Sequence, residues 1–279
     1  MIGASTRLFA VLGSPVDHSL SPRIQNPAFQ AEGVDGVYVA LGCGPEELAG
    51  LIRGIACAGG GGNVTLPYKE AAARIVDEPS DLVRLTGACN TFWLANGRVH
   101  GDNTDVAGFQ GAVRSVLGRS AGGLKVLLLG AGGAARGALV GLLDDDVGHV
   151  SLWNRTLERA ERLASEMGGS RTVVIDSAER FSDEAFDLIV NATSVGLLRD
   201  APMPFDLSKV QRPQAVLDLV YRPEETALVR EARARGIRTA DGGEMLVRQG
   251  AEAFARWWNR AAPLEVMLEA LAGVRRDVR

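Results

Sequence analysis

A short glycine cluster constrains the fold of this chain more than any other feature. The string Gly130-Ala-Gly-Gly-Ala-Ala135 directly follows a largely apolar run, Leu124–Leu129, and opens a helical pattern over Ala134–Leu143. A near-continuous apolar run is typical of a strand in a buried parallel sheet. Glycine at the first position permits a tight turn, glycine at the third lets a ligand approach the backbone, and a small sixth residue lets helix and strand pack closely. The segment predicts a strand–turn–helix unit whose helix N-terminus binds phosphate groups.

A dinucleotide is the ligand that best fits this loop. The chain has 34 glycines in 279 residues, so a glycine string alone is weak and also occurs in tight turns that bind nothing. The strand before it and the helix after it are the context that the dinucleotide fingerprint requires. We therefore expect cofactor contacts from Gly130, Ala131, Gly132, Gly133 and Ala134.

The end of the next strand indicates which dinucleotide binds. Enzymes that use NAD usually carry an Asp or Glu there, which accepts a hydrogen bond from the ribose 2′-OH. This chain has Asn154-Arg155-Thr156 at that point, and its next carboxylate is Glu158. Because an arginine pairs well with a 2′-phosphate, the string predicts NADP. An alternative interpretation is that Asn154 caps a helix over Leu157–Met167.

Elsewhere, short apolar segments alternate with helical ones, which predicts an α/β fold with mainly parallel strands and helices on both faces. Asn96-Gly97 separates two expected strands, Cys89–Leu94 and Arg98–Gly101, and is a strong hairpin signal. After Gly243 the pattern is helical to the end of the chain. A length of 279 residues suits two domains of ordinary size.

Charge and cysteine content exclude several classes of protein. The net charge of −4 argues against nucleic-acid binding, which needs a basic face. Cys43, Cys57 and Cys89 form no C-x-x-C pair, so we expect reduced, mostly buried thiols and no metal site. No apolar run fits a signal sequence or a membrane span. We expect a cytoplasmic enzyme without membrane partners.

Polar strings in the first half of the chain indicate a second site. Ser19 and Ser21 lie two residues apart, so both hydroxyls can bind one carboxylate, although Ser21 before Pro22 is also a common helix cap. Lys69 falls in the first turn of an expected helix, where the helix dipole disfavours a cation. That mismatch favours a functional lysine over an ordinary exposed one. Asp105 is either a helix cap or the partner of Lys69.

Seven strings in order resemble the shikimate dehydrogenase family over roughly residues 7–272. The strings that contain Lys69 and Asp105 are specific to this family and its close relatives, whereas many dehydrogenases share the glycine loop. The strings are His18-Ser-Leu-Ser-Pro22, Asn63-Val-Thr-Leu-Pro-Tyr-Lys69, Gly101-Asp-Asn-Thr-Asp105, Gly130-Ala-Gly-Gly-Ala134, Asn154-Arg-Thr156, Asn191-Ala-Thr-Ser-Val-Gly196 and the run from Asp241 to Gln249.

The resemblance implies an N-terminal α/β substrate domain, a Rossmann-like NADP-binding domain and a C-terminal helix that returns to the substrate domain. The expected boundaries are 1–105 with 241–279 for the substrate domain and 106–240 for the NADP domain. The implied reaction is the reversible, NADP-dependent reduction of 3-dehydroshikimate to shikimate in aromatic amino acid biosynthesis. A monomer and a homodimer are both compatible with the sequence.

The resemblance also implies roles for individual residues. Lys69 and Asp105 form the catalytic pair, and which of them transfers the proton is left open. Ser19 and Ser21 bind the substrate carboxylate. The other implied substrate contacts are Thr65, Asn90, Tyr221 and Gln249, and the other implied cofactor contacts are Asn191, Thr193 and Gly243.

Alternative functions remain open at this point. A sister dehydrogenase acting on quinate or aminoshikimate would differ only in small pocket changes, and a non-catalytic, ligand-sensing homologue would share the fold. The chain departs from the family pattern at Gln25, where relatives often carry His, at Cys89, where Val is usual, and at Glu244. None of these positions is a proposed catalytic group, so the departures bear on substrate affinity.

Overall fold

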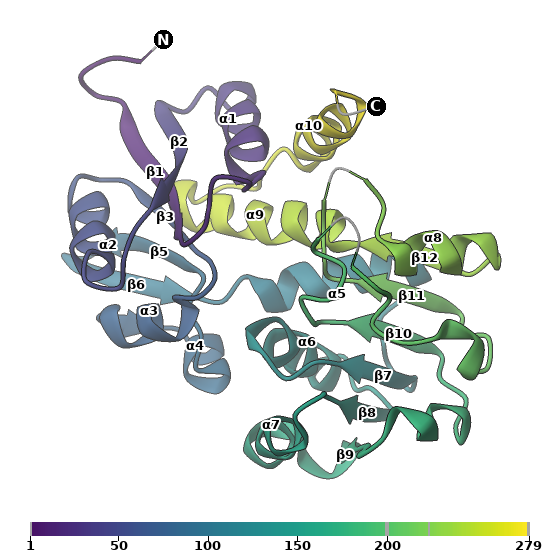
Figure 1. Ribbon diagram of the computed structural model, residues 1–279. Coiled ribbons are helices and arrows are strands. Elements are labelled where there is room, and N and C mark those ends of the chain that lie inside the picture. Colours follow the sequence, from purple (N-terminus) through teal and green to yellow (C-terminus); the bar gives the residue numbers. More distant parts are fainter. Residues whose placement is uncertain (1, 199–200, 223, 278–279) are drawn as a thin grey trace. The chain divides into compact units, whose positions relative to one another are not determined.

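The computed structural model describes residues 2–198, 201–222 and 224–277 (Figure 1). The chain forms two compact units. The first comprises the residues up to Asp105 together with those from Leu246 onward, and the second comprises Val106–Met245. Both units are α/β, as predicted. Within the described ranges, no helix is long and apolar enough to cross a lipid bilayer.

The first unit contains a six-stranded sheet. In chain order its strands are β1 (Arg7–Gly13), β2 (Gly36–Gly42), β3 (Gly61–Val64), β4 (Glu78–Pro79), β5 (Thr91–Ala95) and β6 (Arg98–Asp102). Their spatial order is β2-β1-β3-β5-β6-β4. Strand β1 is parallel to β2 and β3, and β4 is parallel to β6, whereas β5 is antiparallel to both of its neighbours. The sheet is therefore mixed, with the predicted hairpin in its antiparallel part.

Helices cover both faces of this sheet. They are α1 (Ser21–Ala31), α2 (Leu48–Cys57), α3 (Lys69–Ile75), α4 (Asp81–Thr86), the part of α9 (Gly242–Trp258) from Leu246, and α10 (Leu264–Asp277). Successive residues of a strand point to opposite faces. Phe9 and Val11 of β1 accordingly pack in one core with residues of α1, α9 and α10. Ala10 and Leu12 pack in a second core with residues of α2 and α3.

The second unit has a six-stranded sheet in which every pairing is parallel. Its strands are β7 (Lys125–Leu129), β8 (His149–Trp153), β9 (Thr172–Val174), β10 (Leu188–Asn191), β11 (Ala215–Asp218) and β12 (Arg238–Asp241). Their spatial order is β12-β11-β10-β7-β8-β9. This is the doubly wound order of dinucleotide-binding domains, in which ligands bind outside the carboxyl ends of the two central strands, here β7 and β10.

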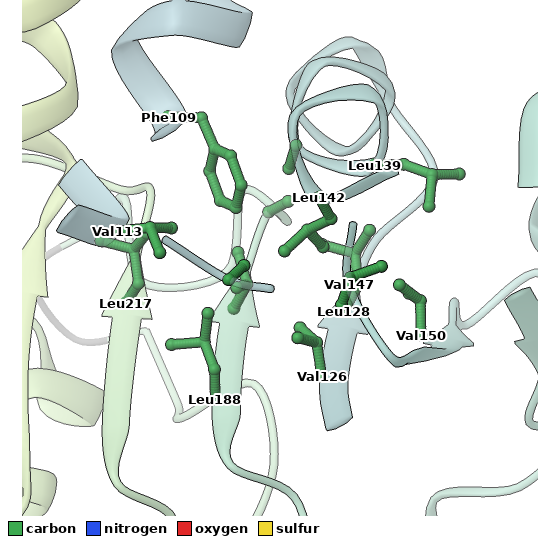
Figure 2. Packing of buried hydrophobic residues seen from close by; sticks show 14 of the residues in the cluster. Phe109, Val113, Val126, Leu128, Leu139, Leu142, Val147, Val150, Leu188 and Leu217 are labelled. Atoms are coloured by element: carbon green, nitrogen blue, oxygen red, sulfur yellow. The ribbon is translucent and has the colours of Figure 1, made fainter. Parts of the chain in front are cut away.

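The helices of the second unit are α5 (Asp105–Leu117), α6 (Gly133–Asp144), α7 (Leu157–Leu163) and α8 (Ala227–Ala234), with short helical turns at Ala164–Gly168, Gly169–Arg171, Ala178–Ser182 and Leu207–Lys209. Val126 and Leu128 face a core with Phe109 of α5 and Leu142 of α6 (Figure 2). Leu127 faces the opposite core, which includes residues of α8. From Val126 to Leu129 strand β7 is apolar, because both of its faces are buried there.

Two sequence expectations about helices were wrong, and a third helix was not expected. The C-terminal helical pattern is broken after Trp258, because Asn259 adopts a left-handed conformation (φ 48°) and Pro263 follows; a proline disfavours helical geometry in the residue before it. The helix expected over Leu157–Met167 is α-helical only to Leu163 and continues as a π-helical turn. Helix α4 was not anticipated, although Ser80 caps it by accepting a hydrogen bond from the Val83 N–H.

The expected burial of the cysteines was correct for only one of three, whereas the expected free thiols are found at all three positions. Cys89 is buried, Cys43 is half-buried and Cys57 is exposed. All three are free thiols, and burial raises the pKa of the Cys89 thiol to about 12. At this position the cysteine is therefore a small protonated side chain within the core of the first unit.

Candidate active site

Lys69 and Asp105 are in direct contact in the first unit. Lys69 Nζ lies 2.6 Å from Asp105 Oδ2, and the two side chains are only 20% and 7% exposed. Each residue is the first of its helix, Lys69 in α3 and Asp105 in α5. A charge-assisted hydrogen bond of this length is strong and holds both groups in a fixed orientation. The structure thus brings together the two residues of the predicted catalytic pair.

Asn90 and Gln249 join this pair in a buried polar network. Asn90 Nδ2 lies 2.9 Å from Asp105 Oδ1, so both oxygens of that carboxylate accept a hydrogen bond. Asn90 Nδ2 also lies 3.0 Å from Thr104 Oγ1 and 3.4 Å from Gln249 Oε1. Asn90 and Gln249 are 2% and 9% exposed. Four predicted site residues, remote in sequence, therefore meet at one place.

A tight turn, formed by Asn103, Thr104 and Asp105 and called the 103–105 turn below, presents the carboxylate. Asn103 Oδ1 accepts a hydrogen bond from the Asp105 N–H two residues later, which closes an Asx turn. The Thr104 N–H donates to Asn90 Oδ1. The Asp105 carboxylate accepts from Lys69 and Asn90, so this side chain is the partner of Lys69.

Sequence reasoning assigned no role to several polar residues around Asn90. Asn63 donates to Thr91 Oγ1 at 3.0 Å and accepts from Tyr38 Oη at 2.7 Å. Thr91 Oγ1 in turn donates to Asn90 Oδ1 at 2.9 Å. Polar residues in apolar strand patterns were the available signal, because buried polar groups need partners. Asn63 and Thr91 pair across β3 and β5.

Ser19, Ser21 and Thr65 carry hydroxyl groups available for further hydrogen bonds. Ser19 Oγ accepts from the Ser21 N–H at 3.3 Å, which leaves its own proton to donate. Within the described ranges, the hydroxyls of Ser21 and Thr65 make no hydrogen bond to another protein group. Ser21 is inside α1, whose cap position is Leu20. The interpretation of Ser21 as a helix cap is therefore wrong.

The glycine loop in the second unit has the geometry expected of a phosphate site. Gly130 has a φ of +113° and a Cβ there would lie 2.8 Å from the carbonyl oxygen of Ala192, so the turn itself requires glycine. A Cβ at Gly132 or Gly133 would have no heavy atom within 4 Å. Close packing therefore does not explain these two glycines, whereas the approach of a ligand to the backbone does. Ala131 and Ala134 are half-buried beside them.

The start of α6 adds free hydrogen-bond donors. Its N-cap, Gly132, has no side chain to satisfy the first N–H groups, and the first turn contains no acidic residue. An uncapped helix N-terminus of this kind attracts anions. The string Asn154-Arg155-Thr156 follows β8, the neighbour of β7. Asn154 donates to the Thr156 carbonyl and does not cap α7, whose N-cap is Thr156; the capping alternative is wrong.

Arg155 is exposed, and among the described residues it has no ion pair or hydrogen-bond partner. No described carboxylate neutralises its guanidinium group, which can therefore pair with an anionic ligand.

Asn191 supports the turn that follows β10. Its Oδ1 accepts from the N–H and the hydroxyl of Thr193, and its Nδ2 donates to the Val195 carbonyl and to Asp218 Oδ1 at 2.8 Å. Asp218 is fully buried, and burial raises its pKa to about 6. The Asn191 side chain is thus fully used within the protein, and Thr193 lies close to the Gly130 turn, with its Cγ2 3.2 Å from where a Cβ on Gly130 would be.

The remaining predicted residues also lie in the second unit. Tyr221 is half-buried after β11, and Gly243 is buried in the first turn of α9, where its N–H donates to Asp241 Oδ1 at 3.0 Å. Among the residues that the structure describes, no group of three or more His, Cys, Asp or Glu side chains could hold a metal ion.

Family models match three successive stretches of the chain. A model of the shikimate dehydrogenase substrate binding domain matches residues 11–92, a model of shikimate / quinate 5-dehydrogenase matches 113–218, and a model of the shikimate 5'-dehydrogenase C-terminal domain matches 242–272. The three matches run in the same order as the two units and the return of the chain to the first.

Individual relatives agree with the family models. The shikimate dehydrogenase (NADP(+)) of Salinibacter ruber is 39% identical over 97% of this chain and 98% of its own length. The crystal structure of shikimate dehydrogenase from Aquifex aeolicus is 37% identical, covers 97% of this chain and 99% of its own, and superposes with a TM-score of 0.90. The shikimate 5-dehydrogenase from Thermus thermophilus, solved with NADP(H) and shikimate, is 39% identical over 96% of this chain and 100% of its own, with a TM-score of 0.87.

Proposed function

The chain belongs to the shikimate dehydrogenase family, and from this premise we propose that it catalyses the reversible, NADP-dependent reduction of 3-dehydroshikimate to shikimate. The observation that carries the proposal is the contact of Lys69 with Asp105 inside a buried polar network. A non-catalytic homologue would have no need to hold a lysine and a carboxylate in this way.

Most of the proposed substrate contacts lie in the first unit. Ser19 and Ser21 bind the carboxylate at the start of α1, where the first turn contains no acidic residue to repel it. Thr65, Asn90 and Gln249 bind ring hydroxyls, together with Asp105. Tyr221 is proposed as a further substrate contact. Hydroxyl and amide groups suit this task because a site built to pair with substrate hydroxyls rejects analogues that lack them.

Lys69 is the proposed proton donor in the reduction. As an ammonium group it has three N–H bonds, of which one points to Asp105; since no other described residue accepts from Lys69, the remaining two can reach the carbonyl oxygen of the substrate. Charge that develops on that oxygen is stabilised by the ammonium group, which then transfers a proton to it. Asp105 accepts hydrogen bonds at both oxygens, which fixes the orientation of its side chain and fits its role as the group that orients Lys69.

The second unit provides the proposed NADP site. Gly130, Ala131, Gly132, Gly133 and Ala134 bind the pyrophosphate, and Arg155 with Asn154 and Thr156 binds the adenosine 2′-phosphate. Thr193, held by Asn191, and Gly243 contact the nicotinamide half. The open space around Gly132 and Gly133 fits this ligand, and so does Arg155, which has no ion-pair partner among the described residues. When bound, NADPH supplies the hydride for the carbonyl carbon.

The activity is tested by the appearance of NADPH absorbance when the purified protein is given NADP⁺ and shikimate. We expect turnover with shikimate, and a higher kcat/KM than with quinate or aminoshikimate measured in parallel. Absence of turnover with shikimate by a folded protein that binds NADP⁺ would contradict the proposal.

The proposal includes a role in aromatic amino acid biosynthesis, in which shikimate is an intermediate. Expression of the chain should restore growth without aromatic amino acids to a bacterium that lacks its own shikimate dehydrogenase. A Lys69→Ala version expressed at the same level should not.

A further inference from the structure

Arg256 of α9 forms an ion pair with a buried carboxylate just before the 103–105 turn. Its Nε lies 2.9 Å from Asp102 Oδ2, and the Asp102 side chain is 6% exposed. The other oxygen, Oδ1, accepts hydrogen bonds from Ser80 Oγ at 2.6 Å and from the Asn103 N–H at 2.8 Å. A buried carboxylate with this set of donors is tightly oriented. The ion pair therefore links α9 to the last residue of β6.

The same helix carries Gln249, seven residues before Arg256 and on the same face. Gln249 Oε1 lies 3.4 Å from Asn90 Nδ2 and 3.5 Å from Thr104 Oγ1. Both distances are at the long end of the hydrogen-bond range. Contacts this long contribute little to holding the helix, so the position of Gln249 depends on what fixes α9.

Other contacts fix α9 to different parts of the unit. Gln25 of α1 donates to the Gly250 carbonyl at 2.8 Å, and Phe254 and Trp257 pack in the core that contains α1 and one face of β1. These contacts set the distance of α9 from α1 and from the sheet. Arg256 instead sets its distance from the segment that ends in Asp105.

We propose that Arg256 is a positioning residue for substrate binding, which acts through Gln249. By holding α9 on Asp102, it keeps the Gln249 carboxamide beside Asn90 and the 103–105 turn. The inference rests on the proposed function, because it takes Gln249 to bind a ring hydroxyl. The donor–acceptor distances of a good and of a lost hydrogen bond differ by only a few tenths of an ångström. A displacement of about that size is therefore enough to remove Gln249 from this network.

The first test compares Arg256→Met, which keeps an unbranched apolar stem, with the wild-type enzyme. The KM for shikimate should rise about tenfold, while kcat and the KM for NADP⁺ change less than about twofold, because a weakened ground-state contact appears in KM. Arg256→Lys retains a cation and should show a smaller rise. The matched control is Arg260→Met, since Arg260 is exposed and lies 3.8 Å from Glu32; its KM for shikimate should be unchanged.

The second test asks whether Arg256 acts through Gln249. In a Gln249→Ala background, Arg256→Met should raise the KM for shikimate no further, because residues that act as one unit are not additive. An equal rise in both backgrounds would overturn the proposal. An unchanged KM for shikimate in Arg256→Met, with only a lower Tm, would also overturn the proposal, because it would show that the ion pair has a structural role alone.

A third readout does not require activity and separates this inference from the proposed function. Amide hydrogen exchange in segments 103–105 and 246–250 should be faster in Arg256→Met than in the wild type or in Arg260→Met. If the wild-type enzyme fails to oxidise shikimate, the proposed function is wrong, and exchange still decides whether Arg256 orders these segments. Unchanged protection would refute the inference. If Arg256→Met does not fold, Arg256→Lys should show the same changes at smaller size, and their absence would refute it.

Discussion

Replacing Asp218 by asparagine should remove a pH dependence from the stability of the protein. Burial raises the pKa of Asp218 from 3.8 to about 6, even though hydrogen bonds from Thr226, Val220 and Asn191 favour the ionised form. The unfolded chain keeps the ordinary value. Between these two pH values the folded state therefore binds a proton that the unfolded state does not. The contribution of this group to stability is largest below about pH 4 and is lost as the pH rises through about 6.

The size of the effect follows from the two pKa values. At 1.36 kcal/mol per pH unit, the interval from 3.8 to about 6 corresponds to about 3 kcal/mol over the whole titration, of which about 1 kcal/mol falls between pH 7 and pH 5. The Asp218→Asn protein should fold, because the Thr226 hydroxyl, which now donates to Oδ2 at 2.6 Å, can rotate to accept from the new amide group.

The assay is urea unfolding of wild-type and Asp218→Asn proteins at about pH 5 and about pH 7. The free energy of unfolding of the wild type, relative to the variant, should increase by about 1 kcal/mol at the lower pH. Asp206→Asn is the control, since Asp206 has a lowered pKa and loses its contribution only at pH values below this window. A difference between wild type and Asp218→Asn that stays constant, or that grows with rising pH, would refute the reasoning.

Two further predictions concern the binding sites. Arg155→Ala should raise the KM for NADPH by about 10- to 100-fold, because a charge-assisted bond of about 1.5–3 kcal/mol is lost. The KM for shikimate and the KM for NADH should stay nearly unchanged. Equal NADPH affinity before and after the change would remove Arg155 from the site. Ser21→Ala should raise the KM for shikimate more than it lowers kcat. Loss of a helix cap would lower the free energy of unfolding by about 1 kcal/mol. A melting curve should show no such decrease, because Leu20 occupies the cap position.

Local sequence signals predicted the elements that depend on neighbouring residues. The glycine loop after an apolar strand predicted the β7–turn–α6 unit. Asn96 and Gly97 have φ values of 52° and 73° in the hairpin that joins β5 and β6, which is the backbone geometry that this pair of residues favours. The strings around Lys69 and Asp105 pointed to two residues that the structure brings within hydrogen-bonding distance.

Contacts between distant segments could not be predicted in the same way. Arg256 meets Asp102 across 154 positions of sequence, and periodicity along one helix does not name its partner on another element. Helix α4 has only six residues, too few to give a clear 3.6-residue pattern. The π-helical end of the helix that begins with α7 depends on backbone hydrogen bonds that no residue type marks.

The kcat of the Lys69→Ala protein tests the central claim most directly. Lys69 meets a neutral carbonyl in the ground state and a charged oxygen at the transition state, so its loss should lower kcat by about 10²- to 10⁴-fold and change the KM for shikimate much less. Lys69→Arg should not restore the rate, because a guanidinium group does not give up its proton near neutral pH. Circular dichroism should show that the variant is folded. A folded Lys69→Ala protein with near-normal kcat would contradict the mechanism, even though the chain would remain a member of its family.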